Sequence, residues 1–287
     1  NVVAAIRGGA RDYLPWPFAV AELAQAMSRL SSNTNPQSED AHGLVGTSPA
    51  MVEVRRQIRL FAPLELPVLI TGPSGSGKEL VARAIHRQSA RAAAELVAVN
   101  CAALPAEVFE AEMYGTRAGA FTGAVRRDGW VAAAEGGTLF LDEVGDLAPR
   151  SQASALRMIE TGDYVPLGST SVAQSNVRIV AATNRELLGR DTFREDLYWR
   201  LNVLQIEVPG LAERKEDLRD LAQHLLDTSH LPGCLLSEDA GMLLPELDWP
   251  GNVRQLRNAR YRACALSGGS VILPEHLLPG SRRTPVS

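Results

Sequence analysis

A glycine-rich turn between an apolar run and a helix-compatible run constrains the fold of this chain more than any other feature. The segment Gly72-Pro-Ser-Gly-Ser-Gly77-Lys78 directly follows the apolar residues Val68–Thr71 and precedes residues Leu80–Ser89. At a strand-to-helix junction such a turn can wrap its N–H groups around phosphate oxygens, while the helix directs its positive dipole end at them. The segment predicts an α/β fold with a phosphate-binding loop. The alternative is an ordinary glycine-rich connection between a strand and a helix.

The side chain of Lys78 would neutralise the β- and γ-phosphates of a nucleotide held by this loop. Position 79 is Glu rather than the Ser or Thr whose hydroxyl commonly holds Mg²⁺. The hydroxyl that commonly holds Mg²⁺ is therefore missing from this position. The predicted nucleotide-binding residues of the segment are Gly72, Pro73, Ser74, Gly75, Ser76, Gly77, Lys78 and Glu79.

A second apolar run ends in two carboxylates, Thr138-Leu-Phe-Leu-Asp142-Glu143. A strand before them would place Asp142 at the carboxyl edge of the sheet, beside the phosphate-binding loop, where it can join the Mg²⁺ shell. Glu143 would polarise the attacking water. Alone, two acidic residues after an apolar run also mark a strand that leaves the core. Together with Lys78, they predict an Mg²⁺-dependent enzyme that hydrolyses a nucleoside triphosphate.

Strand-like runs alternate with helix-compatible stretches between about Leu44 and Gly210. Buried parallel strands have continuous apolar runs, and their connections place helices on both faces of the sheet. The alternation therefore predicts a five-stranded parallel sheet sandwiched by helices. After Gly210 the strand signal stops, and Leu218, Leu221 and Leu225 repeat at helical spacing, which predicts a small all-α domain. The five strand-like runs are residues 67–71, 96–99, 138–141, 177–182 and 204–208.

The expected organisation has five segments. Residues 1–30 contain a short strand, a turn and a helix, and residues 31–43 form a polar linker. The α/β part spans residues 44–210, the helical part spans residues 211–280, and a polar tail spans residues 281–287. The chain begins with Asn1 in the middle of a pattern, so we expect a fragment of a longer protein.

Composition and charge restrict the class of protein. With 45% hydrophobic and 22% charged residues, the composition is typical of a soluble globular chain, and the net charge of −4 is no nucleic-acid signature. No apolar run reaches the roughly 18 residues of a membrane span, and there is no signal peptide. Cys101, Cys234 and Cys264 have no metal-site spacing, so we expect reduced thiols in a cytoplasmic protein.

A glycine-bounded hexapeptide, Gly119-Ala120-Phe121-Thr122-Gly123-Ala124, lies between the phosphate-binding loop and the Asp142-Glu143 strand. GAFTGA in this place resembles the hallmark loop of the bacterial enhancer-binding proteins, the AAA+ activators of sigma-54 RNA polymerase. Other segments agree, and the resemblance covers roughly residues 44–280. These segments are Asn100–Leu104, Glu110–Gly115, Glu135–Val144, Val180–Asn184, Phe193–Leu201 and Trp249–Arg254.

The resemblance implies an AAA+ P-loop ATPase with a small helical lid, which binds ATP and Mg²⁺ and forms a ring, expected to be a hexamer. It also implies that the GAFTGA loop rises toward sigma-54 and remodels the closed complex of the RNA polymerase holoenzyme, which opens promoter DNA. Glycines at both ends of the loop permit backbone angles closed to other residues. An exposed Phe121 at its tip would need a partner to cover it. The alternative is a hairpin tip with Phe121 tucked back into the domain.

Single residues acquire roles from the same resemblance. Asn100 resembles a switch residue that hydrogen-bonds Glu143; otherwise it only caps the following helix. Asn184 follows Thr183 at the end of another strand and resembles sensor I. Arg254 resembles the sensor II arginine, for which the alternative is an ordinary salt bridge on a helix.

Arg194 and Arg200 match the arginine fingers of the family. A finger acts across a subunit boundary, where its planar guanidinium stabilises the charge on the transferring phosphate. The alternative for either arginine is a surface ion pair with Glu195 or Asp196. One departure from the family lies in a second pore-side loop, residues 162–168, where Pro166 stands at a position usually taken by a basic residue.

The head of the chain, residues 9–23, resembles the last strand and helix of a response-regulator receiver domain, which suggests a two-component system. Trp16 stands where receivers normally carry a lysine, so ordinary phosphoryl signalling is not expected. Contact with enhancer DNA would come only from a domain outside this chain, and no membrane partner is expected. The sequence favours an ATPase that remodels sigma-54 holoenzyme. The alternative is a nucleotide-binding regulatory module of a response regulator that does not remodel sigma-54.

Overall fold

The structure is a computed structural model that describes residues 43–103, 105–120, 125–189, 191–228 and 234–277. Its contacts divide the chain into two units, Asn1–Leu44 and Val45–Ser287, and all elements below belong to the second. Several predicted segments lie outside the described residues. They are the receiver-like residues 1–30, the linker up to residue 42, the loop residues 121–124 and the tail, residues 281–287.

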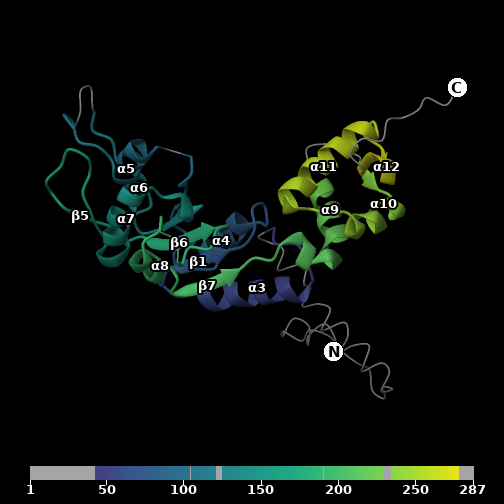
Figure 1. Ribbon diagram of the computed structural model, residues 1–287, viewed down its shortest axis with the longest axis horizontal. Coiled ribbons are helices and arrows are strands. Elements are labelled where there is room, and N and C mark those ends of the chain that lie inside the picture. Colours follow the sequence, from purple (N-terminus) through teal and green to yellow (C-terminus); the bar gives the residue numbers. More distant parts are fainter. Residues whose placement is uncertain (1–42, 104, 121–124, 190, 229–233, 278–287) are drawn as a thin grey trace, which may run out of the picture. The chain divides into compact units, whose positions relative to one another are not determined.

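Five parallel strands form the central sheet in the order β2-β3-β6-β1-β7 (Figure 1), which confirms the predicted fold class. In register, Asn100 pairs with Asp142 and Thr71 pairs with Thr183. The carboxyl ends of four strands, and with them the predicted site residues, therefore meet at one edge of the sheet. The strands are β1 (Val68–Thr71), β2 (Leu96–Asn100), β3 (Thr138–Asp142), β6 (Arg178–Thr183) and β7 (Leu204–Glu207).

Helices cover both faces of this sheet. On one face, α4 (Lys78–Arg87) packs on β1, β3 and β6, and α3 (Pro49–Phe61) packs on α4 and β7. On the other face, Leu139 and Leu141 share an apolar cluster with a second set of helices, whereas the buried Phe140 between them lies outside it. Because side chains alternate along a strand, β3 is buried on both faces, which explains its continuous apolar run. The second set of helices is α5 (Ala106–Tyr114), α6 (Trp130–Ala133), α7 (Pro149–Thr161) and α8 (Glu195–Leu201).

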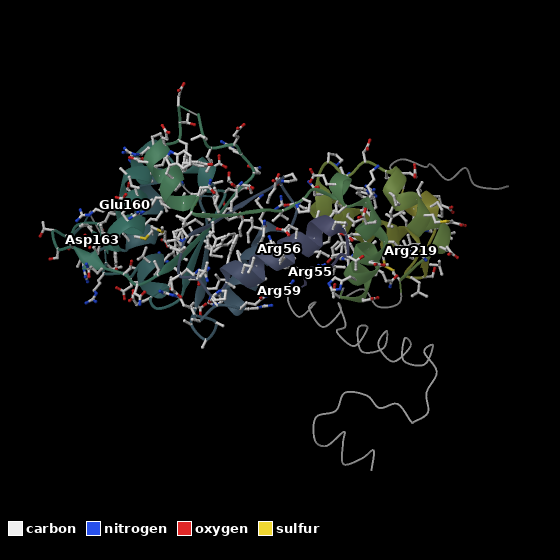
Figure 2. The ribbon with its side chains drawn as sticks, turned by 90° about the horizontal axis from the view of Figure 1, so that it is seen from below. Arg55, Arg56, Arg59, Glu160, Asp163 and Arg219 are labelled. Atoms are coloured by element: carbon white, nitrogen blue, oxygen red, sulfur yellow. A yellow bond between two sulfur atoms is a disulfide. The ribbon has the colours of Figure 1, made fainter. Side chains whose placement is uncertain are left out.

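A short antiparallel hairpin, β4 (Asp163–Tyr164) and β5 (Ala173–Gln174), follows α7. Figure 2 labels Glu160 and Asp163, which lie near the end of α7 and at the start of β4. The 3-10 turn η2 (Val144–Asp146) follows β3 on the way to α7. The hairpin contains most of the predicted second pore-side loop, so its position relative to Gly119 and Ala120 bears on function.

The described residues 211–228 and 234–277 form a helical subdomain with its own apolar cluster, which includes Leu218, Leu221 and Leu256. The predicted helical lid is confirmed, but strands do not stop at Gly210, because β8 and β9 pair in parallel there. Two residues per strand are too few to give a periodic signal. The elements are η3 (Leu211–Glu213), η4 (Lys215–Asp217), α9 (Leu218–Asp227), β8 (Leu235–Leu236), α10 (Glu238–Leu243), η5 (Leu244–Glu246), α11 (Asn252–Leu266), β9 (Val271–Ile272) and α12 (Pro274–Leu277).

The cysteines differ from the sequence prediction. Cys234 and Cys264 form a disulfide with their Cα atoms 5.9 Å apart, whereas Cys101 is free and buried. The expectation of three reduced thiols is therefore wrong for this pair. A separation of 30 residues along the chain does not reveal that the residue before β8 lies beside the last turn of α11.

Within the described ranges, no helix combines the length and the apolar character that crossing a bilayer requires.

Candidate functional site

The predicted phosphate-binding loop connects β1 to α4, as the sequence pattern requires. Gly75 has a φ of 75°, and a Cβ atom there would lie 2.6 Å from the carbonyl oxygen of Gly251. Only glycine fits this position, because any side chain would strain the backbone and collide with the residue before α11. Gly77 precedes α4 and supplies no side-chain cap, so the first N–H groups of the helix are available to an anion.

Lys78 lies buried at the base of this loop. Its Nζ donates hydrogen bonds to the carbonyl oxygens of Gly72 at 3.0 Å and Pro73 at 3.4 Å. Burial lowers the pKa of the Lys78 ammonium, and the negative charges of Glu143 and Asp142 oppose that shift. The buried hydroxyl of Ser76 has no hydrogen-bond partner within the described part of the chain. The loop therefore holds a cation and an unused polar group, which suits an anionic ligand.

Asp142 and Glu143 follow one another at the end of β3, but their backbones differ. Asp142 is the last strand residue, whereas Glu143 has a left-handed conformation with φ of 51° and ψ of 49°. Left-handed backbone is uncommon for a residue other than glycine, and it persists where surrounding contacts hold it. The side chain of Glu143 makes those contacts. Its Oε2 accepts the Asn184 N–H at 3.2 Å, and its Oε1 lies 3.8 Å from Lys78 Nζ.

The donor set at this edge fits one divalent cation shared with phosphate oxygens. Burial raises the pKa of Asp142, the adjacent Glu143 charge raises it further, and Lys78 opposes the rise. A cation would relieve the repulsion between these two carboxylates. Among the described residues there is no cluster of three His, Cys, Asp or Glu side chains that could hold a metal by itself. Mg²⁺ commonly binds through one or two carboxylates plus substrate phosphates and water, which matches this arrangement.

A cavity of about 310 Å³ brings the two motifs together with the helical subdomain. The guanidinium of Arg254 reaches the loop, where its Nη1 donates to Ser74 Oγ at 3.2 Å. The cavity thus contains four of the sequence-predicted charged groups: Lys78 and Arg254 as cations, and Asp142 and Glu143 as carboxylates. It is lined by Gly75, Gly77, Lys78, Glu79, Leu80, Asp142, Glu143, Leu225, Val253, Arg254 and Arg257.

A larger cavity of about 560 Å³ lies in the helical subdomain around Trp249, Arg254 and Arg262. It has no wall from the phosphate-binding loop and none from Asp142 or Glu143. Size alone favours this cavity, but chemistry favours the smaller one, since only that one combines backbone N–H groups, a lysine and carboxylates. We therefore assign the candidate site to the 310 Å³ cavity.

The predicted switch residue Asn100 lies at the correct edge of the sheet but has a local partner. Its Oδ1 accepts the N–H of Ala102 at 2.9 Å within a turn. The following helix α5 begins at Ala106 with Pro105 as its N-cap, so Asn100 does not fill the capping role given above as the alternative. Glu143 contacts Asn184 and Lys78 instead. The hydrogen bond from Asn100 to Glu143 is thus not formed in this structure, and the switch role stays a prediction for another nucleotide state.

Of the predicted fingers, Arg194 directly precedes α8 and Arg200 lies on it, and neither lines the cavity. Arg194 forms a two-point ion pair with Asp196, at 3.0 and 2.7 Å, and its side chain is half exposed. Arg200 is exposed, and its Nη2 donates to the Glu160 carbonyl oxygen at 3.3 Å. Within one chain neither arginine can act on a ligand in the site, so a finger role requires a second copy.

Three residues near the loop were missed by the sequence reasoning. Buried Arg214 donates from Nη2 to the Ser76 carbonyl oxygen at 2.9 Å, and burial lowers its pKa. Asn252 donates from Nδ2 to the Ser74 carbonyl oxygen at 3.0 Å. Arg257 lines the cavity one helical turn beyond Arg254, and this i,i+3 spacing on α11 was the one available signal.

The base of the GAFTGA loop is hydrogen-bonded to the second pore-side loop. The Arg117 N–H donates to the Leu167 carbonyl oxygen at 2.9 Å, and the Leu167 N–H donates to the Gly115 carbonyl oxygen at 2.9 Å. Ala120 lies so close to Gly168 that a Cβ atom at position 168 would be 2.5 Å from the Ala120 Cβ. The two loops therefore have a shared backbone contact despite Pro166. Phe121, Thr122, Gly123 and Ala124 lie outside the described residues.

Comparison with known proteins matches two families along the chain. The description Sigma-54 interaction domain applies to residues 44–207, and AAA+ ATPase lid domain applies to residues 212–285. The chain is 43% identical to the transcriptional regulatory protein ZraR of Escherichia coli K12, over 100% of this chain and 68% of ZraR. It is 44% identical to the DNA-binding transcriptional regulator NtrC of Bradyrhizobium, over 92% of this chain and 58% of NtrC.

A solved structure has a similar fold. The crystal structure of NtrX from Brucella abortus in complex with ATP superimposes with a TM-score of 0.76 at 38% sequence identity. The match covers 97% of this chain and 67% of the NtrX chain. The similarity thus extends through both the sheet and the helical subdomain.

Proposed function

Since this chain belongs to the sigma-54 interaction domain family of AAA+ ATPases, we propose that it hydrolyses ATP between the subunits of a ring, a hexamer by resemblance. The energy of this turnover would remodel the closed complex of sigma-54 RNA polymerase holoenzyme and open promoter DNA. One observation carries the proposal. Lys78, Asp142, Glu143 and Arg254 converge on one cavity, although they come from three separated parts of the sequence.

The ATP phosphates would occupy the loop between β1 and α4. The N–H groups at the start of α4 and the Lys78 ammonium neutralise the β- and γ-phosphates, and Arg254 adds a second cation from α11. ATP-bound NtrX supports this assignment by its similarity. Asp142 is the residue that would hold Mg²⁺, which supplies charge neutralisation to the phosphates when bound.

Glu143 is positioned to act on the attacking water. A carboxylate beside the γ-phosphate can polarise water and accept its proton during attack. The Asn184 N–H holds one oxygen of Glu143, so the side chain has a fixed direction while its left-handed backbone places it past the end of β3. Asn184 thereby connects β6 to the hydrolytic carboxylate, which is consistent with a sensor role.

The two candidate finger arginines support an ATP site that two neighbouring subunits form together. Arg194, directly before α8, and Arg200, on α8, are both exposed and absent from the lining of the cavity in their own chain. In a ring, α8 of one subunit would present a guanidinium to the ATP of its neighbour, where it stabilises the charge that develops on the transferring phosphoryl group. Ring formation thus becomes a requirement for hydrolysis.

Residues 119–124 would transmit the result of hydrolysis to sigma-54. Gly119 has a φ of 86°, and the hydrogen bonds of Arg117 and Leu167 tie the loop base to the neighbouring hairpin. A shift of either loop therefore displaces the other. This gives a physical route from the ATPase sheet to the surface that contacts sigma-54.

A pulldown tests the coupling directly. The chain should retain purified sigma-54 in the presence of ADP with aluminium fluoride, a mimic of the transition state, and release it with ADP alone. Lys78→Ala should bind no nucleotide and retain no sigma-54 under either condition. ATP hydrolysis without any nucleotide-dependent retention of sigma-54 would contradict the remodelling role, and absence of Mg²⁺-dependent hydrolysis would contradict the ATPase itself.

A further inference from the structure

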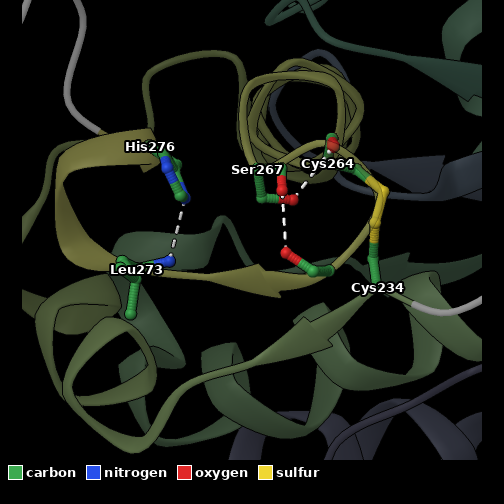
Figure 3. Close-up of a disulfide and its surroundings, with 6 residues drawn as sticks. Cys234, Cys264, Ser267, Leu273 and His276 are labelled. Atoms are coloured by element: carbon green, nitrogen blue, oxygen red, sulfur yellow. Dashed lines mark hydrogen bonds between the residues drawn. A yellow bond between two sulfur atoms is a disulfide. The ribbon is translucent and has the colours of Figure 1, made fainter. Parts of the chain in front are cut away.

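The disulfide between Cys234 and Cys264 lies inside the helical subdomain (Figure 3). Its Cα–Cα distance of 5.9 Å falls in the usual range for disulfides. Both residues are buried, with 7% and 4% of their surfaces exposed, in the apolar cluster that also contains Leu226 and Leu256. The bond therefore connects two segments of a packed core rather than two surface loops.

This bond closes a small structural unit at the end of α11. The Cys264 carbonyl oxygen accepts from Ser267 Oγ at 3.0 Å, and the Ser267 carbonyl oxygen accepts from Ser270 Oγ at 2.8 Å (Figure 3). The Leu235 N–H, directly after Cys234, donates to the Ser270 carbonyl oxygen at 3.1 Å. Hydrogen bonds and the disulfide thus hold the end of α11 to the beginning of β8 from two sides.

The other end of the same helix contacts the phosphate-binding loop. Asn252 begins α11 and binds the Ser74 carbonyl oxygen, and Arg254 binds Ser74 Oγ. At a rise of about 1.5 Å per residue, a helix of this length spans roughly 20 Å as one rigid element. A constraint on the position of Cys264 can therefore restrict the position of Arg254, although the two residues are not in contact.

We propose that Cys234 and Cys264 are a reversible thiol–disulfide site that sets the affinity of the chain for ATP through α11. The inference rests on the proposed role of Arg254 in nucleotide binding. The sequence predicts a cytoplasmic protein, and disulfides that form in that reducing compartment are usually transient and catalytic or redox-sensing, so this bond favours regulation. The cross-link restricts local unfolding of the helical subdomain, and the oxidised form therefore keeps Arg254 at the loop for a larger fraction of the time.

The chemistry requires a two-electron oxidant and a dithiol reductant. When hydrogen peroxide oxidises the pair, the two S–H bonds break and one S–S bond forms, while the peroxide takes up two electrons and two protons and becomes two waters. Dithiothreitol reverses the step, because its two thiols reduce the S–S bond and become a cyclic disulfide. Cys101 supplies an internal control. It is free and lies in the apolar cluster of the sheet rather than in that of the helical subdomain, so it has no cysteine beside it to bond with.

Two measurements on the complete 287-residue chain test the proposal. Peptide mapping after unfolding and alkylation should show Cys234 joined to Cys264 in the peroxide-treated chain and both alkylated after dithiothreitol, with Cys101 alkylated in both samples. The Kd for ATP should be at least about fivefold lower for the oxidised chain, a typical size for coupling between two sites. Cys234→Ser and Cys264→Ser should each bind ATP with the reduced-state Kd in both conditions.

The outcomes separate this inference from the proposed function. Three alkylated cysteines after peroxide treatment would overturn the redox site. A reversible disulfide with the same Kd for ATP in both states would overturn the coupling through α11, while leaving the ATPase intact. A chain that binds no ATP in either state would contradict the proposed function as well. If a serine variant does not fold, the reduced wild-type chain provides the same comparison, because it has the same residues without the bond.

Discussion

The ammonium of Lys78 and the carboxylate of Glu143 lie 3.8 Å apart, so the cation of the phosphate-binding loop and the proposed catalytic base already face each other. The arrangement has a consequence for binding. A phosphate chain that enters the loop competes with Glu143 for Lys78, and the carboxylate is then released toward water. Binding of the triphosphate would thus prepare the base for its role in hydrolysis.

Glu143→Gln should separate binding from turnover. The amide keeps the size of the side chain but cannot accept a proton, so we expect hydrolysis to fall by roughly 10²- to 10⁴-fold while ATP still binds. Phosphate release measures the first quantity and isothermal titration the second. Glu53→Gln is the matched control, because Glu53 is an exposed glutamate paired with Arg56 on α3. Turnover near that of the wild type would remove Glu143 from the mechanism.

Mixing two inactive variants tests whether Arg200 acts across a subunit boundary. Arg200→Ala should bind ATP but lose about 10³- to 10⁵-fold in turnover, as for other arginine fingers. Lys78→Ala should fail to bind ATP but keep its own Arg200. In mixed rings some sites combine an intact loop from one variant with an intact finger from the other, so activity should partly return.

The control for the mixing experiment is Arg157→Ala, an exposed arginine of α7 whose ion pair with Asp163 measures 3.7 Å. This variant alone should keep wild-type turnover. A mixture of Lys78→Ala and Arg200→Ala that stays inactive would argue against a finger in trans.

Local motifs allowed much of the fold and part of the site to be predicted. The loop before Lys78 and the pair Asp142-Glu143 were found because each is a short segment whose residue types and flanking strand carry the chemistry. Arg214 and Asn252 were missed because they meet Ser76 and Ser74 across 138 and 178 residues of sequence. Such contacts depend on how distant segments pack, which no short pattern records.

The partners of single side chains were also beyond sequence reasoning. Asn100 was predicted to bind Glu143, yet its amide oxygen accepts a local N–H, and Glu143 instead lies beside Lys78. The disulfide was missed for a different reason. The prediction of reduced thiols rested on the expected cytoplasmic location, whereas bond formation depends on the placement of Cys234 beside α11.

Gly168→Ala should uncouple hydrolysis from sigma-54. A Cβ atom there would collide with Ala120 and displace the base of the GAFTGA loop. We expect ATP turnover to change by less than about threefold, because Gly168 is not among the residues that line the cavity, while nucleotide-dependent retention of sigma-54 is lost. Gly136→Ala is the matched control, since its φ of 72° resembles the 75° of Gly168 but no atom lies within 4 Å of the added Cβ. Equal loss of sigma-54 binding in both variants would point to backbone strain rather than to the loop contact.

Asp217→Asn should destabilise the fold. The buried Asp217 carboxylate accepts hydrogen bonds from the N–H groups of Thr47 and Ser48 and from Ser48 Oγ, at 2.6–2.8 Å. An amide removes the charge and presents a donor to these donors, so the free energy of unfolding should fall by about 2–4 kcal/mol. Urea unfolding measures the loss. Asp220→Asn, an exposed position in the first turn of α9, should change it by less than about 0.5 kcal/mol. A loss at Asp217 no larger than at Asp220 would show that the network contributes little.

Alkaline pH should weaken the fold through two buried groups. Burial raises the pKa of the Cys101 thiol from 9.0 to about 12 and that of the Tyr114 phenol from 10.0 to about 12. Both pKa values are higher in the folded chain than in the unfolded chain, so the stabilisation is complete below pH 9 and is lost as pH rises toward 12. Between these values each group can lower the free energy of unfolding by up to about 1.4 kcal/mol per pH unit. Urea unfolding between pH 8 and pH 10.5 should show this decline, and Cys101→Ala should make it shallower between pH 9 and pH 10, where Tyr114 contributes least. An unchanged slope in that variant would mean that Cys101 is ionised, or reaches solvent, in the folded chain.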